Sequence, residues 1–288
     1  EVVPYTTKLG LDTHTYAVNQ SSPITRYGVE WIVDFKRIES INTAIRLDGT
    51  YYGYRQLSTD IREYSQSSTV GADGEPYKYV GFYYGGNAAT NGSKSQTVKT
   101  NVTVTTQIPK VRMIVSLKLQ ATLLRYSRSL SETADGGARS FIVKDRSDIL
   151  NTVAGSVYDG RNFAVTYPEY YISAADPDTK RNYLEDLRWA RENDPKMYSD
   201  LSKLATVSNY LYIYAEDYIT PYFSANISVT KEIGDIASIS FYANNFFNNL
   251  GQVKSSKTGE YATLGNTPFA NGRYIPGFFY GLSLRLKF

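Results

Sequence analysis

The sequence predicts an all-β, antiparallel fold, with strands of the kind that form a segment of a transmembrane β-barrel. Three observations support this prediction: an alternation of apolar and polar residues that recurs along the chain, connections that are alternately short and long, and a final strand that alternates without a break to the last residue. Successive side chains of a strand point to opposite faces, so each segment describes a ribbon with one apolar and one polar face. Segments of about ten residues with this pattern are typical of outer-membrane barrels.

The first predicted hairpin joins residues 24–35 to residues 41–54. Its first strand places Val29 and Trp31 on the same face, and the second strand repeats the alternation after a short connector. The polar, glycine-rich residues 55–96 then interrupt the pattern, so we expect a long loop there.

The second predicted hairpin joins residues 99–107 to residues 111–124. Pro109 lies between them, and because proline cannot donate a hydrogen bond to a strand ladder, it belongs in the turn. Residues 125–221 lack the strand alternation and are expected to form a second long loop. A loop of this length should carry function or a fold of its own.

A short helix is predicted within this second loop. Apolar residues around Leu187 recur at helical spacing, Asp178 or Thr179 is the expected N-cap, and Pro195 is the expected end.

The last predicted hairpin joins residues 222–231 to residues 237–246. A third long loop, 247–276, leads to the final strand, 277–288, which ends in Phe288. Together these segments give seven strands, or eight if residues further upstream add one.

The connections also predict an orientation. The short turns are expected at 36–39, 108–110 and 231–235. If the terminal phenylalanine lies on the periplasmic side, counting strand directions backwards places every short turn there and every long loop on the cell surface, as in bacterial barrels.

Composition excludes several other classes of protein. The 27 tyrosines and 12 phenylalanines exclude a disordered chain, and no apolar run is long enough for a transmembrane helix. Without cysteine the chain has no disulfide and no thiol chemistry. The net charge of +3, with both signs interspersed, predicts no nucleic-acid partner.

Seven predicted strands cannot close a barrel on their own. Bacterial barrels have even strand numbers, and an open edge in hydrocarbon leaves a row of costly unpaired backbone groups. Residues 1–23 contribute at most part of an eighth strand, and the chain starts at Glu1 without a leader. We therefore expect the carboxyl-terminal part of a longer barrel protein.

Two stretches of the sequence resemble a known family. Residues 227–249, ISVTKEIGDIASISFYANNFFNN, followed by GEYATLGNTPF and GFFYGLSLRLKF, are similar to the carboxyl end of TonB-dependent outer-membrane receptors of Bacteroidetes, in the SusC/RagA-related group. Residues 26–55, RYGVEWIVDFKRIESINTAIRLDGTYYGYR, resemble barrel strands of the same group. The resemblance covers both ends of the chain and not the long central loop.

The resemblance implies a fold, a location and a set of partners. The fold is a barrel of about 22 strands around a plug domain, located in the outer membrane of a Gram-negative bacterium. The implied partners are outer-membrane lipid, the remainder of the barrel and its plug, TonB, and a SusD-like surface lipoprotein. The implied function is import of a scarce nutrient, such as a glycan, peptide, siderophore or vitamin, which surface loops capture and the polar lumen passes inward.

The final strand also resembles the signal that the barrel-assembly machinery reads. Gly281, Leu284, Leu286 and the terminal Phe288 stand at the matching places. Phe279 departs from the pattern, since a polar residue is usual two positions before the glycine.

Two sets of candidate functional residues follow. Charged residues on the polar sides of the predicted strands could line a solute path: Glu30, Asp34, Arg46, Asp48, Arg112, Lys118 and Arg285. Solvated charges on the wet side of a barrel are the plainer interpretation for most of them. Aromatic residues near the outer mouth could stack on a sugar or another flat ligand: Tyr83, Tyr84, Tyr170, Tyr171 and Trp189. Packing within the loops is the alternative for these rings.

No enzyme, cofactor or metal site is predicted. The one histidine, His14, lies in a polar segment, and no serine-hydrolase, metalloprotease or P-loop motif occurs. Two pairs of aspartates could bind calcium but lack EF-hand spacing: Asp145 with Asp148, and Asp176 with Asp178. Helix caps or turns are the expected use of these side chains.

Two other functions remain open. A soluble β-sandwich adhesin or carbohydrate-binding module would pack the apolar faces into a dry core, although its loops would rarely exceed about fifteen residues. A passive porin would share the barrel and lack the plug. The burial or exposure of the apolar faces therefore separates a sandwich from a barrel.

Overall fold

The computed structural model describes residues 2–7, 10–15, 19, 22–63, 78–85, 89–153, 162–208, 215–261 and 277–286, the first two ranges as backbone only. The chain forms two compact units. Unit 1 comprises Glu1–Thr25, Arg55–Lys94 and Arg128–Ala215, and unit 2 comprises Arg26–Tyr54, Ser95–Ser127 and Glu216–Phe288.

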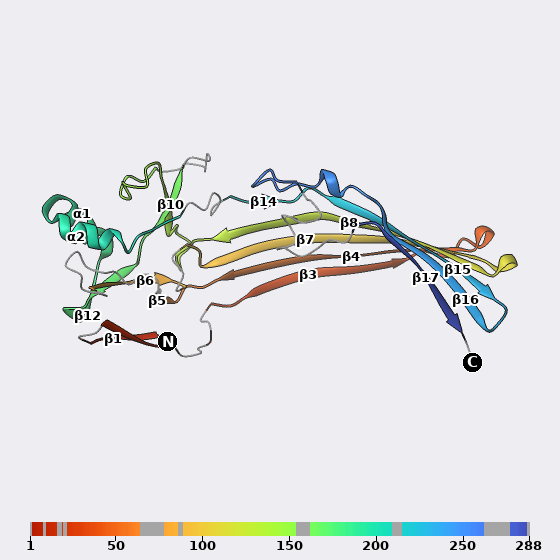
Figure 1. The fold of residues 1–288 in the computed structure, drawn as a ribbon, viewed down its shortest axis with the longest axis horizontal. Coiled ribbons are helices and arrows are strands. Elements are labelled where there is room, and N and C mark those ends of the chain that lie inside the picture. Colours follow the sequence, from red (N-terminus) through yellow and green to blue (C-terminus); the bar gives the residue numbers. More distant parts are fainter. Residues whose placement is uncertain are drawn as a thin grey trace. The chain divides into compact units, whose positions relative to one another are not determined.

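Unit 2 is built on one large antiparallel sheet (Figure 1). Its long strands are β3 (Thr25–Asp34), β4 (Thr43–Leu57), β7 (Gly92–Ile108), β8 (Met113–Leu130), β15 (Tyr222–Ile233), β16 (Ala237–Asn248) and β17 (Phe279–Leu286). They lie in the order β17-β16-β15-β8-β7-β4-β3, and the two-residue strand β14 (Asp217–Tyr218) pairs with β8. Each long strand therefore pairs with the next one in the chain, which confirms the seven predicted strands and their antiparallel arrangement.

The strands of the second hairpin are longer than predicted. β7 begins at Gly92 instead of residue 99, and β8 continues to Leu130 instead of residue 124. The added residues are polar or charged at most positions and lack a clean alternation, so pairing with neighbouring strands, and not the pattern, determines these ends.

Three short turns join successive strands of this sheet. They lie at 35–42, 109–112 and 234–236, and the first two contain the 3-10 turns η1 (Glu39–Ile41) and η2 (Pro109–Val111). Each contains a residue with left-handed backbone: Asn42 (φ 52°), Arg112 (φ 47°) and Gly234 (φ 58°). Pro109 lies in its turn as predicted. The other connections, 58–91, 131–221 and 249–278, are long, so short and long connections alternate as expected.

Unit 1 contains two small antiparallel sheets, a hairpin and two helices. One sheet has the order β13-β10-β9 and the other β12-β11-β6-β5, and β1 pairs with β2. The bounds of these elements are β1 (Val2–Thr7), β2 (Gly10–Thr15), β5 (Ile61–Glu63), β6 (Tyr79–Tyr84), β9 (Ser140–Val143), β10 (Phe163–Thr166), β11 (Tyr170–Ser173), β12 (Asp176–Arg181), β13 (Thr206–Ser208), α1 (Tyr183–Asn193) and α2 (Pro195–Ser202). The predicted long loops 55–96 and 125–221 thus contain regular structure of their own.

A hydrophobic core holds unit 1 together. Its fully or nearly fully buried members come from both helices and from the strands around them: Val143, Ile149, Val165, Tyr167, Tyr171, Tyr183, Leu187, Leu201 and Leu204. The buried tyrosines satisfy their hydroxyls within the core, since Tyr183 Oη donates to the Leu201 carbonyl oxygen at 3.0 Å and Tyr167 Oη donates to that of Ile149. Burial raises the pKa of Tyr167 to about 12, so these tyrosines act as neutral donors.

The predicted helix exists, but its predicted N-cap is wrong. Asp178 and Thr179 lie in β12, which pairs with β11, and the N-cap is Asn182, whose side chain accepts from the Glu185 N–H at 3.3 Å. The predicted end is confirmed, because α1 stops at Asn193 with Asp194 as its C-cap, directly before Pro195. Pro195 then begins α2, since its missing N–H is tolerated in the first turn of a helix. Within the described part of the chain, no helix is long and apolar enough to cross a membrane.

Candidate functional site

The sheet of unit 2 has one apolar face. Registers between β16 and β17 place Phe241 opposite Leu282 and Ile239 opposite Leu284, and β15 continues the face with Val229 opposite Phe241. The exposed apolar side chains of this face are Tyr27, Val29, Val33, Phe35, Leu119, Leu123, Phe223, Ile239, Phe241, Phe247, Tyr280, Leu282, Leu284 and Leu286. Leu282 is 74% exposed and Leu284 63%, so no described residue forms a layer over them.

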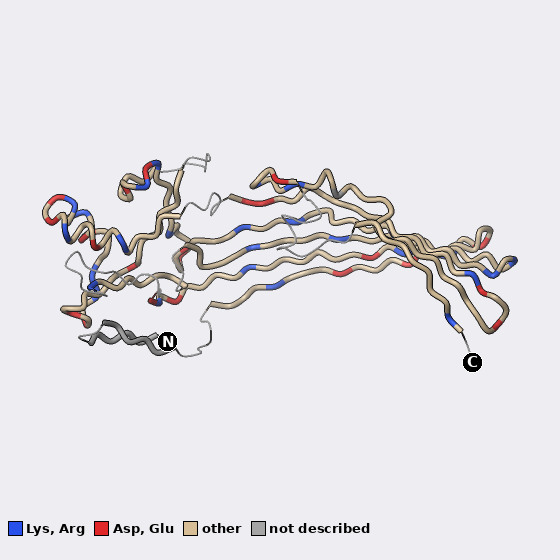
Figure 2. Tube along the Cα trace, viewed as in Figure 1, with Lys and Arg blue, Asp and Glu red and all other residues tan. Residues whose placement is uncertain are grey.

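The opposite face is polar and is joined across the strands by side-chain hydrogen bonds. Asn101 Nδ2 donates to Asp48 Oδ2 at 2.7 Å, Thr105 and Ser116 hydroxyls lie 3.4 Å apart, and those of Thr230 and Ser240 lie 2.8 Å apart. We call this surface the polar face. Charged residues of both signs are scattered along the strands and turns of the unit 2 sheet (Figure 2).

Six of the seven predicted lumen-facing residues lie on the polar face. Arg46 Nε lies 3.6 Å from Asp34 Oδ1, Lys118 is opposite Asn226, and Arg285 is opposite Ser238. Asp48 binds Asn101 as described above, and Glu30 shares the face of Asp34 by strand alternation.

Arg112 is the exception among these seven. It lies in the turn after η2 with a left-handed backbone, and its guanidinium pairs with Asp235 at 3.2 Å in the next short turn.

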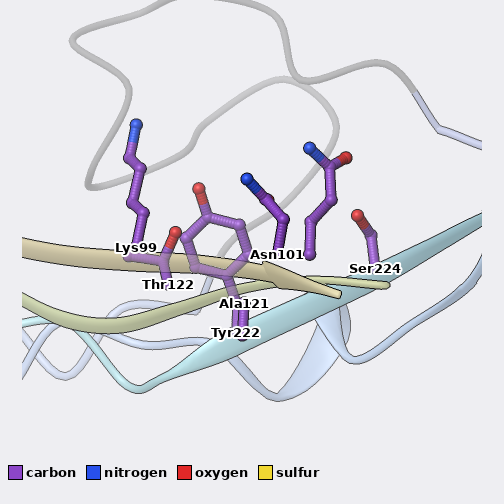
Figure 3. A pocket seen from close by; sticks show the side chains of 7 residues that line it. Lys99, Asn101, Ala121, Thr122, Tyr222 and Ser224 are labelled. Atoms are coloured by element: carbon purple, nitrogen blue, oxygen red, sulfur yellow. The ribbon is translucent and has the colours of Figure 1, made fainter. Parts of the chain in front are cut away.

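A hollow of about 150 Å³ opens on the polar face. It is lined by Lys99, Asn101, Gln120, Ala121, Thr122, Tyr222 and Ser224, from the three adjacent strands β7, β8 and β15. Figure 3 shows the labelled polar side chains projecting to the same side of the sheet. Sequence reasoning missed this cluster because it depends on cross-strand registers, such as Ser224 opposite Gln120, that alternation within one strand does not reveal.

The predicted aromatic ligand residues all lie in unit 1, where two of them belong to the core. Tyr83 and Tyr171 are 1% and 0% exposed. Tyr83 Oη donates to the Leu204 carbonyl oxygen, and Tyr171 Oη donates to Asp186 Oδ2 at 2.6 Å. Burial and this bond raise the pKa of Tyr171. Both rings therefore pack the core.

The other three aromatic candidates reach the surface to different extents. Tyr170 stacks on Phe82 with ring centroids 4.7 Å apart, and the Lys180 ammonium lies 4.8 Å from its ring centre. Tyr84 is half-buried at the end of β6. Trp189 is 55% exposed on α1. The prediction of stacking on a ligand stays a prediction for these three rings.

The predicted assembly signal lies on β17. Leu284 and Leu286 belong to the exposed apolar face, while Phe288 lies outside the described residues. Gly281 is opposite Tyr242, and a Cβ at Gly281 would collide with the ring of that tyrosine. On the apolar face, the ring of Trp31 likewise covers Gly49. Glycine at 281 therefore also has a packing role.

The aspartates considered as calcium ligands have local partners. Asp145 accepts from the Ser147 N–H and hydroxyl, both at 2.8 Å, which lowers the pKa of Asp145, and Asp148 pairs with Arg191 at 3.1 Å. Asp176 and Asp178 lie exposed on β12. The described residues contain no group of three or more potential metal ligands, and the side chain of His14 lies outside them.

A scan against family models, a search of curated proteins and a search of solved structures find nothing that matches this chain.

Proposed function

We propose that this chain forms the carboxyl-terminal barrel part of a TonB-dependent outer-membrane receptor that imports a scarce nutrient. The observation that supports the proposal is the pair of faces of the unit 2 sheet. One face exposes large apolar side chains, and the other is a hydrogen-bonded polar surface. A barrel in a bilayer needs this combination, with lipid outside and water inside.

The exposed face argues against a water-soluble sandwich. Leaving one Leu or Phe side chain in water instead of burying it forgoes about 1.5–3 kcal/mol. Summed over the partly exposed members of the apolar face, this is of the same order as the net stability of about 5–15 kcal/mol that a typical domain has. Contact with acyl chains removes that deficit, whereas the described part of unit 2 contains no second sheet that could do so.

Strand length fits the same proposal. About 9–11 tilted residues cross a bilayer, so the 12 residues of β15 and of β16 suffice. β8 has 18 residues, which gives it a reach of roughly 60 Å at about 3.3 Å per residue. In the proposed topology, the ends of β4, β7 and β8 that lead into the long connections continue past the lipid on the outer side.

The edges of the sheet require further strands. β3 and β17 stand at the two ends of the strand order, and an edge exposed to hydrocarbon would leave its backbone groups unpaired. The remainder of the proposed barrel pairs with these edges, and a plug within that barrel would lie against the polar face. TonB and a surface lipoprotein complete the proposed assembly.

The proposed division of labour follows the two units. Unit 1 is formed largely by the connections that would lie at the cell surface, and its own core keeps it ordered. It is the part that would meet the incoming solute or the lipoprotein, while the polar face of unit 2 would line the route inward.

Dependence on lipid or detergent tests this proposal. The full-length protein should be extracted only with detergent and should migrate differently on gels before and after boiling, as intact outer-membrane barrels do. Monodisperse behaviour in buffer without detergent or lipid would favour the sandwich and would falsify the membrane assignment. Steady conductance to small solutes in planar bilayers would instead identify a passive porin, since a plugged receptor is closed at rest.

A further inference from the structure

We infer that the hollow lined by Lys99, Gln120 and Ser224 is a binding subsite for a carboxylate group of the transported solute. The inference rests on the proposed function for its biological meaning, but its geometry belongs to unit 2 alone. The polar lining residues all lie on the three neighbouring strands β7, β8 and β15. Paired strands of the sheet, and not a loop, therefore position the site.

Neighbouring hydrogen bonds fix the orientation of both amides in the lining. Gln120 Oε1 accepts from Asn226 Nδ2 at 2.8 Å, and Asn226 Oδ1 in turn accepts from the Asn245 N–H at 2.8 Å. The amino group of Gln120 is thereby left to donate. Asn101 uses one N–H for Asp48 and keeps its carbonyl oxygen and its second N–H.

Among the residues of this lining, the Lys99 ammonium is the charged group, and several donors surround it. Lys99 brings three N–H groups and Gln120 two, and the hydroxyls of Thr122 and Ser224 can each donate once. Among the described residues, no carboxylate forms an ion pair with Lys99. A carboxylate accepts only, with two oxygens and one negative charge, and is the group that complements such a lining.

The size of the hollow limits what it can take. About 150 Å³ is below the range of about 300–1,000 Å³ of sites that enclose a whole drug-sized ligand. The hollow therefore suits one unit of a larger solute, with the rest extending over the open polar face. A uronic acid unit of a glycan and the carboxyl end of a peptide are the two sources of this chemistry.

The position along the strands agrees with a role in solute entry. Lys99 precedes the turn residue Pro109 by ten residues, or roughly 33 Å at about 3.3 Å per residue. With strands tilted by about 40°, this corresponds to about 25 Å of height, the height of the apolar band of a barrel. The subsite would lie near the outer margin of the membrane, where an arriving solute first meets the wall.

Equilibrium binding to the full-length protein in detergent tests the inference. The probes are D-galacturonate against D-galactose, and N-acetyl-alanyl-alanine against its carboxyl-terminal amide. We expect one of the acidic probes to bind about tenfold more tightly than its neutral partner, and Lys99→Gln to abolish that difference. The preferred acidic probe identifies the source of the carboxylate.

Two further variants make the result specific. Lys110→Gln removes the same charge from the exposed turn η2, outside the hollow, and should leave all affinities unchanged. Lys99→Arg keeps the charge and should retain most of the preference. Equal binding of acidic and neutral probes, no binding of either acidic probe, or equal effects of the two glutamine variants would overturn the inference. Because the assay involves neither membrane insertion nor transport, its failure is distinguishable from failure of the proposed function.

Discussion

The two units of this chain differ in the burial of their apolar side chains. Unit 1 encloses Leu187 and Leu201 completely and satisfies its buried tyrosine hydroxyls internally, with backbone carbonyls or the Asp186 carboxylate. Unit 2 leaves Leu282 and Leu284 more than half exposed and places its side-chain hydrogen bonds on the opposite face. The first arrangement removes apolar side chains from water, whereas the second leaves them exposed, which agrees with the proposed membrane location.

The same residue types are thus buried in one unit and exposed in the other. The tyrosines of unit 1 pack edge to face in the core, with Tyr79 and Tyr171 at 5.5 Å and 82°, while Tyr280 on the apolar face of unit 2 is 70% exposed. Overall hydropathy therefore says little about this chain, and the position of each residue in the fold decides which solvent it meets.

The largest effect is expected in the core of unit 1. Leu187→Ala should lower the free energy of unfolding of this unit by about 3 kcal/mol, because Leu→Ala changes in well-packed cores cost about 2–5 kcal/mol. Limited proteolysis followed through residues 162–208 would measure it. Arg188→Ala, on the exposed side of α1, is the control and should change stability by less than about 0.5 kcal/mol. Similar losses for both variants would contradict the core described above.

The next effect tests the apolar face of unit 2. Leu282→Lys should reduce folding into lipid vesicles by about 2–4 kcal/mol, the cost of a lysine on the lipid side near the middle of a barrel. Its matched control is Ser283→Lys, one residue further along the same strand on the polar face. Gel migration before and after boiling would report the folded fraction. If the two lysines were equally harmful, the two faces would not differ in solvent.

A smaller effect is expected where Tyr242 covers Gly281. Gly281→Ala should destabilise the sheet by about 1–2 kcal/mol, in the range of overpacking changes, because its Cβ would collide with the tyrosine ring. The double variant with Tyr242→Ala should recover much of the loss if the cause is steric. If the double variant assembles no better than Gly281→Ala, the steric explanation is wrong.

The smallest expected effect is a pH dependence in unit 1. Glu63 is 8% exposed and its Oε2 has no hydrogen-bond partner among the described residues, and burial raises its pKa above the usual 4.5. In the window between 4.5 and the raised pKa, the folded state binds more protons than the unfolded state, so stability falls as pH increases. Glu63→Gln should raise stability at neutral pH and flatten this slope, measured by proteolysis at several pH values. An unchanged slope would contradict the account, and the exposed Glu192→Gln serves as the control.

Much of unit 2 could be predicted from sequence, and much of unit 1 could not. The alternation around Val29 and Leu282 indicates strands because one face must be apolar, and Pro109 marks a turn because it cannot donate. The core of unit 1 joins residues far apart in the chain, such as Tyr83 and Leu204, and no local period reports such contacts. For this reason the sequence predicted Tyr83 and Tyr171 as ligand-binding residues near the surface, although both are buried in the core.

The hollow on the polar face could not be predicted from the sequence for a similar reason. Alternation places Gln120 and Thr122 on the polar face, but only the registers of β8 with its neighbours bring Ser224 beside them. The N-cap of α1 at Asn182 is likewise set by tertiary structure, since Thr179 lies in β12, which pairs with β11.

The ring of Trp31 over Gly49 has a practical consequence for spectroscopy. This chain contains two tryptophans, and the units divide them, with Trp31 in the sheet of unit 2 and Trp189 on α1 of unit 1. Each unit thus carries its own intrinsic fluorophore. Brominated lipids should quench the first and aqueous acrylamide the second, so folding of the two units can be timed separately without an added label.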